Sequence, residues 1–407
     1  MSDFFFLPAW PPPVEDLPWL AFLLIVAVLA GEAVQRWLHL PRLLGWIAAG
    51  VAFGPEGAGL LDEDTLGDIR GLLDIGIGIV LFELGQRIDF GWLRRNPWLL
   101  GASALESALS FAAMWAVLLV LGMPPVLAAV PAAIGMATSP AVVLTLAREL
   151  RAQGQVTERA LLLTALNCLY ALAAVSMLVA WLHAEYRVGW TEVVAHPLYL
   201  LAGSLVLGAA FAGVTLGVLT GLGERTDAQF ICIVVLALVA IALAPVLHLP
   251  VALTLFVYGA LTRVFDRARH FAFLEFGRLG QMVVILLFAL SAANLEFGLV
   301  PAGALAGLAL VIARFAGKTL GLAAFARRSA LPARKAVLLG CALMPMSAVV
   351  LVLAQDTAEL APELGPALAA VILSALAMLE IVGPLAAQFA FKQAGETAAP
   401  RHGPGPA

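Results

Sequence analysis

The sequence predicts an all-helical integral membrane protein with about 13 transmembrane helices. Of its 407 residues, 62% are hydrophobic and only 12% are charged, and the mean hydropathy is +0.99. Soluble domains are about half apolar and about a quarter charged. Apolar runs of spanning length follow one another, separated by prolines, glycines and charged clusters. A water-soluble protein could not bury so much apolar surface, so we expect lipid to surround it.

The predicted transmembrane segments form a nearly continuous series from residue 17 to residue 391. In order they are 17–36, 42–60, 69–88, 97–121, 125–147, 157–182, 197–221, 227–247, 249–264, 276–298, 301–325, 334–354 and 364–391. Residues 1–16 form a predicted extracytoplasmic segment. Residues 392–407 contain too few apolar side chains to fold and are predicted to be a disordered cytoplasmic tail.

The positions of the basic residues support this series. With the amino end outside the cytoplasm, only Arg70 and Arg187 fall on the outer side. Arg314 and Lys318 lie within a segment, which leaves 19 of the 23 Lys and Arg residues on the inner side. The positive-inside rule predicts this asymmetry. We therefore expect a multi-pass protein of the cell inner (plasma) membrane with an extracytoplasmic amino end and a cytoplasmic carboxyl end.

An internal repeat relates the two halves of the chain. Residues 141–147 read AVVLTLA and residues 348–354 read AVVLVLA, an offset of 207 residues. The same offset superposes the third to sixth segments on the tenth to thirteenth. Seven segments separate each pair, an odd number, so the copies run through the membrane in opposite directions. Inverted repeats of this kind are typical of secondary transporters.

Each copy is preceded by a sequence that interrupts a helix. The first interruption reads GMATSP and ends at Pro140, and the second reads MPMS and contains Pro345 and Ser347. Proline removes a backbone donor and frees carbonyls that can face an ion. Paired breaks in matching segments indicate a substrate site where two discontinuous helices cross at mid-membrane. The alternative is a pair of ordinary proline kinks.

Few ionisable residues lie deep within the predicted segments, and burial in lipid makes each a functional candidate. They are Glu83, Glu106, Arg314, Lys318 and Glu380. The repeat offset places Arg314 opposite Ser107, so Glu106 can pair with either Arg314 or Lys318 across the core. Such a pair serves either transport or structure alone. Glu83 and Glu380 are weaker candidates, because both can reach an interface or cap a break.

Polar groups in the sixth segment complete the candidate site. Asn167 offers an amide donor and a carbonyl acceptor, and Cys168 offers a small, nearly apolar thiol. With Thr138 and Ser139 of the first break, they are the predicted ion-binding residues together with Glu106, Arg314 and Lys318. The three cysteines lie in separate apolar stretches, so we expect neither a disulfide framework nor a metal site.

Several short motifs resemble the monovalent cation:proton antiporter superfamily, which includes the sodium/hydrogen exchangers. The LGWIAAG of residues 44–50, followed by Gly54 and Pro55, resembles the family's second helix. The LFELG of residues 81–85, then Ile88-Asp89 and LRRN at 93–96, resembles its third. TSP at 138–140 occupies the place of the family's threonine-aspartate-proline break. Arg314 and Lys318 fall in the helix that carries the family's conserved basic residue, and either can be its match.

The resemblance implies an antiporter of the elevator type. Core helices of residues 69–182 and 276–391 would slide against scaffold helices of residues 17–60 and 197–264, which also form a homodimer. In the family, a sixth-helix carboxylate binds a proton and Na⁺ or K⁺ by turns. Here the family's asparagine-aspartate pair is Asn167-Cys168, and the aspartate of the break is Ser139. The usual coupling carboxylate is therefore missing from its expected position.

Three hypotheses follow. The protein is a divergent cation:proton antiporter in which Glu106, or else Glu83, is the titrating carboxylate. Alternatively, it uses the same fold to carry an anion or small polar solute, or it is a non-transporting membrane scaffold or sensor. No nucleotide loop, metal-ligand cluster or nucleophile–base pair is present in the sequence. We therefore expect no enzymatic activity, no cofactor and no nucleic-acid partner.

Overall fold

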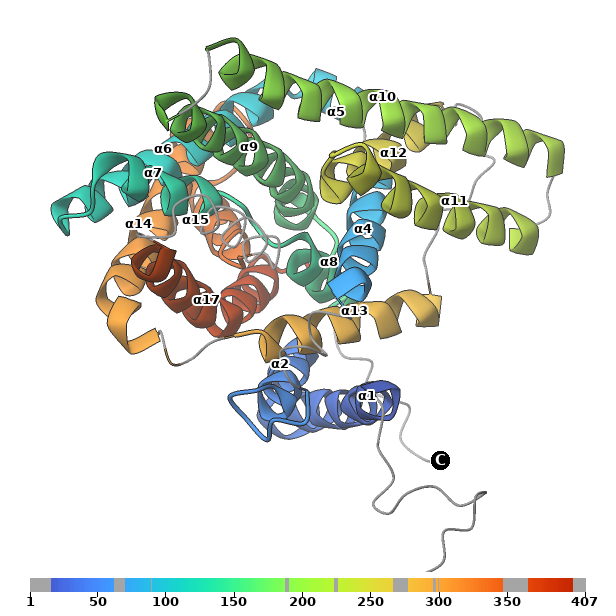
Figure 1. The fold of residues 1–407 in the computed structure, drawn as a ribbon, viewed down its shortest axis with the longest axis horizontal. Coiled ribbons are helices and arrows are strands. Elements are labelled where there is room, and N and C mark those ends of the chain that lie inside the picture. The colour runs from blue at the N-terminus through green and yellow to red at the C-terminus, as the bar shows by residue number, and fades with distance from the viewer. Residues whose placement is uncertain are drawn as a thin grey trace, which may run out of the picture. The chain divides into compact units, whose positions relative to one another are not determined.

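The computed structural model describes residues 16–61, 70–88, 90–186, 190–222, 226–265, 277–295, 298, 300–346 and 365–397. In these ranges every regular element is helical (Figure 1). The chain forms two compact units. The first comprises residues 1–73 and 281–295, and the second comprises residues 74–280 and 296–407.

The first unit packs short helices closely through glycines. It holds α1 (Asp16–Ala33), the π-helical turn η1 (Val34–Leu38), α2 (Arg42–Phe53) and most of α13 (Gly277–Ala293). A Cβ on Gly50 of α2 would lie 1.9 Å from the carbonyl oxygen of Ala289 in α13. The predicted segment 42–60 is shorter in the structure, because Gly54 and Pro55 end α2.

The second unit contains the remaining helices. They are most of α4 (Arg70–Gln86), then α5 (Phe90–Arg95), α6 (Pro97–Val120), α7 (Pro125–Ile134), α8 (Pro140–Glu149), α9 (Gln155–Tyr186), α10 (Trp190–Leu222), α11 (Thr226–Val246), α12 (Val251–Phe265), α14 (Val300–Phe325), α15 (Ala333–Ala342) and α17 (Gly365–Gln393).

Helix α14 lies against both α6 and α17 through two pairs of glycines spaced four residues apart. Gly303 and Gly307 meet α17, where a Cβ on Gly303 would lie 2.1 Å from the carbonyl oxygen of Ala370. Gly317 and Gly321 meet α6 in the same way. Small residues at this spacing let helix backbones approach closely in membranes. The three helices therefore form a tightly packed group, here called the α6–α14–α17 group.

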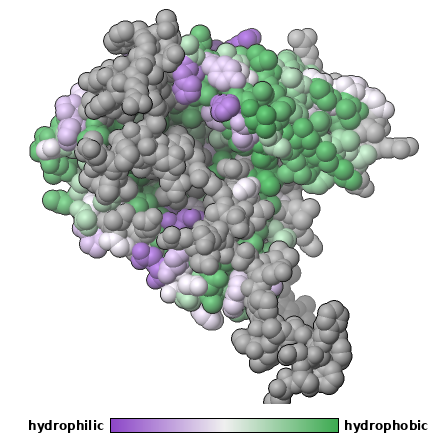
Figure 2. Space-filling view, viewed as in Figure 1, coloured by the Kyte–Doolittle hydropathy of each residue, from purple (hydrophilic) through white to green (hydrophobic). Residues whose placement is uncertain are grey.

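A second group consists of α10, α11 and α12, which lie side by side in Figure 1. Large apolar side chains on α10 and α11 are exposed, among them Leu198, Val206 and Ile231. In Figure 2 the surface over these two helices is strongly hydrophobic. An apolar surface of this extent matches a lipid environment, because soluble proteins rarely expose one.

Helix lengths agree with a multi-pass membrane protein. Among the described residues, seven helices are long and apolar enough to span a membrane, and four further apolar helices of 10–17 residues accompany them. The predicted fifth segment is two helices, α7 and α8, separated at residues 135–139. The count of about 13 spans stays a prediction. Residues 347–364, which include Ser347 and the second repeat copy, lie outside the described residues.

The carboxyl end differs from the predicted boundary at residue 391. Helix α17 continues to Gln393, and Glu396 is buried with only 8% of its surface exposed. Composition suggested a disordered segment because residues 392–397 contain few apolar side chains. Their order comes instead from hydrogen bonds between polar groups, which hydropathy does not measure. Residues 398–407 lie outside the described residues.

Candidate functional site: two interrupted helices and a buried ion pair

The first interruption is a short non-helical segment between α7 and α8. Pro140 is the first residue of α8, a position where its missing N–H costs nothing. Ser139 caps the helix, because its side chain accepts a hydrogen bond from the Val142 N–H at 3.3 Å. The residue that stands in place of the family's aspartate therefore acts as a helix cap.

The second interruption follows α15 and meets the first. The Ser139 N–H donates to the carbonyl of Pro345 at 2.9 Å. The Thr138 hydroxyl donates to the carbonyl of Leu343 at 3.2 Å. These two bonds join segments about 200 residues apart, and we call this meeting point the crossing. The prediction that the two breaks lie together is confirmed for the described residues.

Arg314 of α14 is fully buried at the crossing and binds the carbonyls that the breaks leave free. Its guanidinium donates to the carbonyls of Gly135 at 2.7 Å, Ala137 at 2.8 Å, Met344 at 2.5 Å and Pro345 at 3.3 Å. It also lies 3.5 Å from the Thr138 hydroxyl. The carboxyl ends of α7 and α15 both point here, and a cation is favourable at such ends. The carbonyls that were predicted to face an ion therefore bind the Arg314 guanidinium.

Lys318 lies one turn further along α14 and forms the ion pair that the sequence predicted as one of two alternatives. Its Nζ is 3.1 Å from Glu106 Oε2 and 3.1 Å from the carbonyl of Met136. Glu106 and Lys318 are both fully buried, and Glu106 Oε1 has no hydrogen-bond partner among the residues that the structure describes. A buried pair with one unused carboxylate oxygen is incompletely satisfied. That oxygen is available to a ligand.

Close helix packing fixes this pair. A Cβ on Gly321 would lie 2.3 Å from Glu106 Cα, and one on Gly317 would lie 2.5 Å from Ser110 Cα. The two backbones therefore approach closely on either side of Lys318. Preorganisation of this kind needs glycine at both positions.

Asn167 and Cys168 of α9 contact the first break from the other side. Asn167 Nδ2 donates to the Thr138 hydroxyl at 3.2 Å, and its Oδ1 accepts from the Ser107 hydroxyl at 3.0 Å. Cys168 Sγ donates to the Thr138 carbonyl at 3.2 Å. The structure thus brings together Thr138, Ser139, Asn167, Cys168, Arg314, Lys318, Glu106, Pro140 and Pro345.

A small cavity of about 40 Å³ adjoins Cys168 between α4, α9 and α12. Among the described residues its walls are apolar apart from the thiol, and none of those that line it is acidic. They are Leu81, Ala137, Ala165, Cys168, Leu169, Ala171, Leu172, Ala252, Leu253 and Phe256. The position that carries a carboxylate in the family is therefore an apolar surface here.

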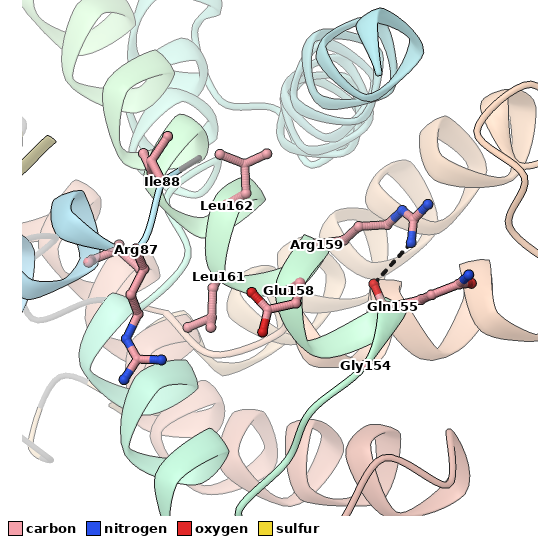
Figure 3. A pocket seen from close by; sticks show the side chains of 9 residues that line it. Arg87, Ile88, Gly154, Gln155, Glu158, Arg159, Leu161 and Leu162 are labelled. Carbon is pink, nitrogen blue, oxygen red and sulfur yellow. Dashed lines mark hydrogen bonds between the residues drawn. The ribbon is translucent and has the colours of Figure 1, made fainter. Parts of the chain in front are cut away.

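A larger cavity of about 470 Å³ lies closer to the first turn of α9. Figure 3 shows Arg87, Glu158 and Arg159 around it, with Arg159 donating to the carbonyl of Gln155 at 3.2 Å. Both cavities follow the same two helices, α4 and α9, and this one is lined by Leu84 and Leu161 where the smaller one is lined by Leu81 and Ala165. The larger cavity therefore has charged side chains in its wall, whereas the smaller one beside Cys168 is lined by apolar side chains apart from the thiol.

The two weaker candidates lie apart from the crossing. Glu83 is buried and pairs with Arg87 at 3.3 Å and with Arg148, which ties α4 to the end of α8. Glu380 is 6% exposed in α17 and makes no ion pair within the part of the chain that the structure describes. Neither contributes to the contacts at the crossing.

The comparisons with known proteins can be set against this geometry. The transmembrane model of the sodium/hydrogen exchanger family matches residues 21–392. The chain belongs to the sodium/hydrogen exchanger family. Its fold also matches that of a solved sodium proton antiporter, so the predicted all-helical antiporter fold is confirmed.

Two solved structures of the sodium proton antiporter MjNhaP1 from Methanocaldococcus jannaschii resemble this exchanger-family chain. One was determined at pH 8 and superposes with a TM-score of 0.72 at 14% identity, covering 93% of this chain and 95% of that one. The other, from an electron microscopy map, has a TM-score of 0.74 at 15% identity and covers 94% and 99%. At such identities the likeness concerns the fold.

Two curated relatives match shorter stretches. The iron transporter MagA of Paramagnetospirillum magneticum is 34% identical over 74 residues, which are 18% of this chain and 16% of that protein. The Na⁺/H⁺ antiporter NhaS5 of Synechocystis is 34% identical over 102 residues, which are 25% and 14%. The chain therefore spans less than a fifth of the length of either relative.

Sequence reasoning missed two groups in this exchanger-family chain. Ser107 holds the amide of Asn167, and the repeat offset that placed it opposite Arg314 was a signal for its depth in the bundle. Glu396 was missed because it falls in a polar tail. Its carboxylate contacts α9 and α15, helices that lead into the crossing.

Proposed function

We propose that the protein exchanges a monovalent cation, Na⁺ or K⁺, for a proton across the inner membrane, with Glu106 as the exchange carboxylate. The observation that carries this proposal is the fully buried Glu106–Lys318 pair beside the crossing, in which one carboxylate oxygen has no hydrogen bond to any described residue. Membership of the exchanger family and the fold shared with a sodium proton antiporter support it.

In the proposed exchange, the transported cation replaces the protonated Lys318 as the counter-ion of the Glu106 carboxylate. In one state the Lys318 ammonium neutralises the carboxylate. In the other, the incoming cation binds Glu106 and Lys318 gives up one proton to water on the side that the site faces. One positive charge replaces another, so the summed charge of Glu106, Lys318, Arg314 and the bound cation is the same in both states. Arg314 keeps its carbonyl partners throughout.

Alternating access is proposed to follow the elevator mechanism of the family. The core helices of residues 69–182 and 276–391 would carry the crossing past scaffold helices of residues 17–60 and 197–264, and the scaffold would form a homodimer. The amino end would be extracytoplasmic and the carboxyl end cytoplasmic, as the basic residues predict.

The test is proton flux in proteoliposomes driven by a Na⁺ or K⁺ gradient. Glu106→Gln should abolish the flux, whereas Glu380→Gln, which removes another buried carboxylate from the same unit, should keep it. Glu106→Gln leaves Lys318 buried without its partner, so the double variant Glu106→Gln/Lys318→Met serves as a folded equivalent. Undiminished flux in Glu106→Gln would exclude Glu106 as the exchange group.

A second candidate, transport of an anion or small polar solute, is favoured by one observation. Within the described ranges, the crossing holds two cationic side chains and one carboxylate, and the residues that line the cavity beside Cys168 include no acidic one. Thermal melting with a panel of ions separates the two functions. Stabilisation by chloride or a small carboxylate, with no effect of Na⁺ or K⁺, would favour the second.

A further inference from the structure

Glu396 lies just beyond the end of α17 and is turned back toward the bundle. Gly395 has φ +70°, a left-handed conformation that glycine adopts without strain, and its N–H donates to the carbonyl of Lys392 at 3.1 Å. The Glu396 N–H donates to the carbonyl of Phe391 at 3.3 Å. The side chain is thereby directed into the protein.

The Glu396 carboxylate binds the first turn of α9. It accepts from the N–H groups of Val156 at 3.0 Å and Thr157 at 2.9 Å, and from the Thr157 hydroxyl at 3.0 Å. The first N–H groups of a helix have no partner within the helix, and a carboxylate is a favourable one. A residue about 240 positions away therefore acts as the cap of α9.

The neighbouring backbone is shaped to admit this carboxylate. The Gln153 N–H donates to the Glu396 carbonyl at 2.8 Å. Gly154 has φ +155°, and a Cβ there would lie 2.3 Å from Glu396 Cδ. A side chain at position 154 would thus displace the cap.

The same carboxylate reaches a second helix. Lys335, in the first turn of α15, donates to Glu396 Oε1 at 3.0 Å. Helix α15 leads into Leu343 and Pro345 of the crossing, and α9 carries Asn167 and Cys168. One buried carboxylate therefore joins the starts of the two helices whose inner parts meet at the crossing.

We propose that Glu396 is a positioning residue, which couples the start of α9 to the start of α15 and so holds the crossing in register. Its purpose rests on the proposed transport function, but its test uses hydrogen exchange and needs no transport. Glu396 contacts none of the residues at the crossing directly, so its effect must pass through the two helices.

Hydrogen exchange of the full-length protein in detergent distinguishes coupling from simple capping. Glu396→Ala should speed exchange of the Val156 and Thr157 amides about five- to tenfold, the expected effect of a lost cap. It should also speed exchange of the Ser139 amide, which donates to Pro345 across the crossing. Faster exchange at residues 156 and 157 with an unchanged Ser139 amide would overturn the proposal, as would no change at all.

A second variant separates the two ends of the contact. Lys335→Met removes only the bond to α15, so the Val156 and Thr157 amides should stay protected while the Ser139 amide exchanges faster. Glu158→Gln is the matched control, because Glu158 is an exposed carboxylate on the same turn of α9. Unchanged Ser139 exchange in Lys335→Met would overturn the coupling even if Glu396→Ala failed to fold.

If flux is present, Glu396→Ala should lower its maximal rate several-fold and leave the apparent KM for the cation unchanged. A raised KM with an unchanged maximal rate would contradict a role in positioning. Absence of flux in the parent protein would count against the proposed antiport. The hydrogen-exchange measurement would then decide whether Glu396 is a positioning residue.

Discussion

Arg314 and Lys318 lie one turn apart on α14 and are both fully buried, yet their partners differ in kind. Arg314 binds four backbone carbonyls from the two breaks, whereas Lys318 binds a carboxylate and a single carbonyl. Carbonyls cannot change charge, so in the proposed exchange the Arg314 contacts stay as they are. A carboxylate can exchange one cation for another, which makes the Lys318 contact the replaceable one.

The largest effect is expected from Arg314→Met. The Pro345 carbonyl keeps the Ser139 N–H as a donor, but the carbonyls of Gly135, Ala137 and Met344 lose Arg314. Each buried carbonyl left without a partner costs about 1–3 kcal/mol, so three of them should lower the free energy of unfolding by about 3–9 kcal/mol. Thermal melting in detergent measures this. Arg314→Lys keeps the charge but cannot form the same set of hydrogen bonds. Its melting temperature should therefore lie between those of the parent protein and Arg314→Met. An Arg314→Met variant that melts like the parent would contradict the structural role.

Lys318→Met should destabilise the protein by about 3–5 kcal/mol, because Glu106 is then buried without a counter-ion. Adding Glu106→Gln should restore part of that loss, giving a coupling energy of about 1–3 kcal/mol in a double-mutant cycle. Additive effects of the two substitutions would show that the pair contributes nothing in the folded protein.

Gly321→Ala tests the packing that holds the pair. The new Cβ would lie 2.3 Å from Glu106 Cα, so a loss of about 1–3 kcal/mol is expected from overpacking. Gly217→Ala in α10 is the control, because nothing lies within 4 Å of a Cβ there. That change should stabilise the protein by about 0.4–1 kcal/mol. Equal melting temperatures for the two variants would refute the close approach of α6 and α14.

The smallest effect concerns acid and Glu396. Burial raises the pKa of this carboxyl, but hydrogen bonds from Val156, Thr157 and Lys335 outweigh it, so the pKa lies below the ordinary 4.5. A lowered carboxyl pKa stabilises the fold fully above the ordinary value, and the contribution is lost as the pH falls through the lowered one. Protection of the Val156 and Thr157 amides should therefore persist at neutral pH and decline in acid. Loss of protection near neutral pH would contradict this.

Much of the fold was predictable from the sequence because lipid imposes long apolar segments and a one-sided distribution of basic residues. The crossing was predictable because an interruption with a proline, Pro140 in the first and Pro345 in the second, lies beside the start of each repeat copy. The roles of Arg314 and Lys318 were not, since one helical turn separates them and only the side-chain contacts show which binds carbonyls and which binds Glu106. Glu396 was unpredictable because two of its partners are backbone N–H groups, which leave no trace in the sequence, and because its side-chain partners Thr157 and Lys335 lie far from it along the chain.

In the proposed exchange, Lys318 loses one proton when a cation binds Glu106. Proton release on cation binding measures this step directly. Purified protein in weakly buffered detergent solution is titrated with NaCl or KCl beside a pH indicator, with choline chloride as the control salt. The account predicts about one proton released per cation bound in the parent protein, and none in Glu106→Gln/Lys318→Met. Equal proton release from the parent and the double variant would contradict it.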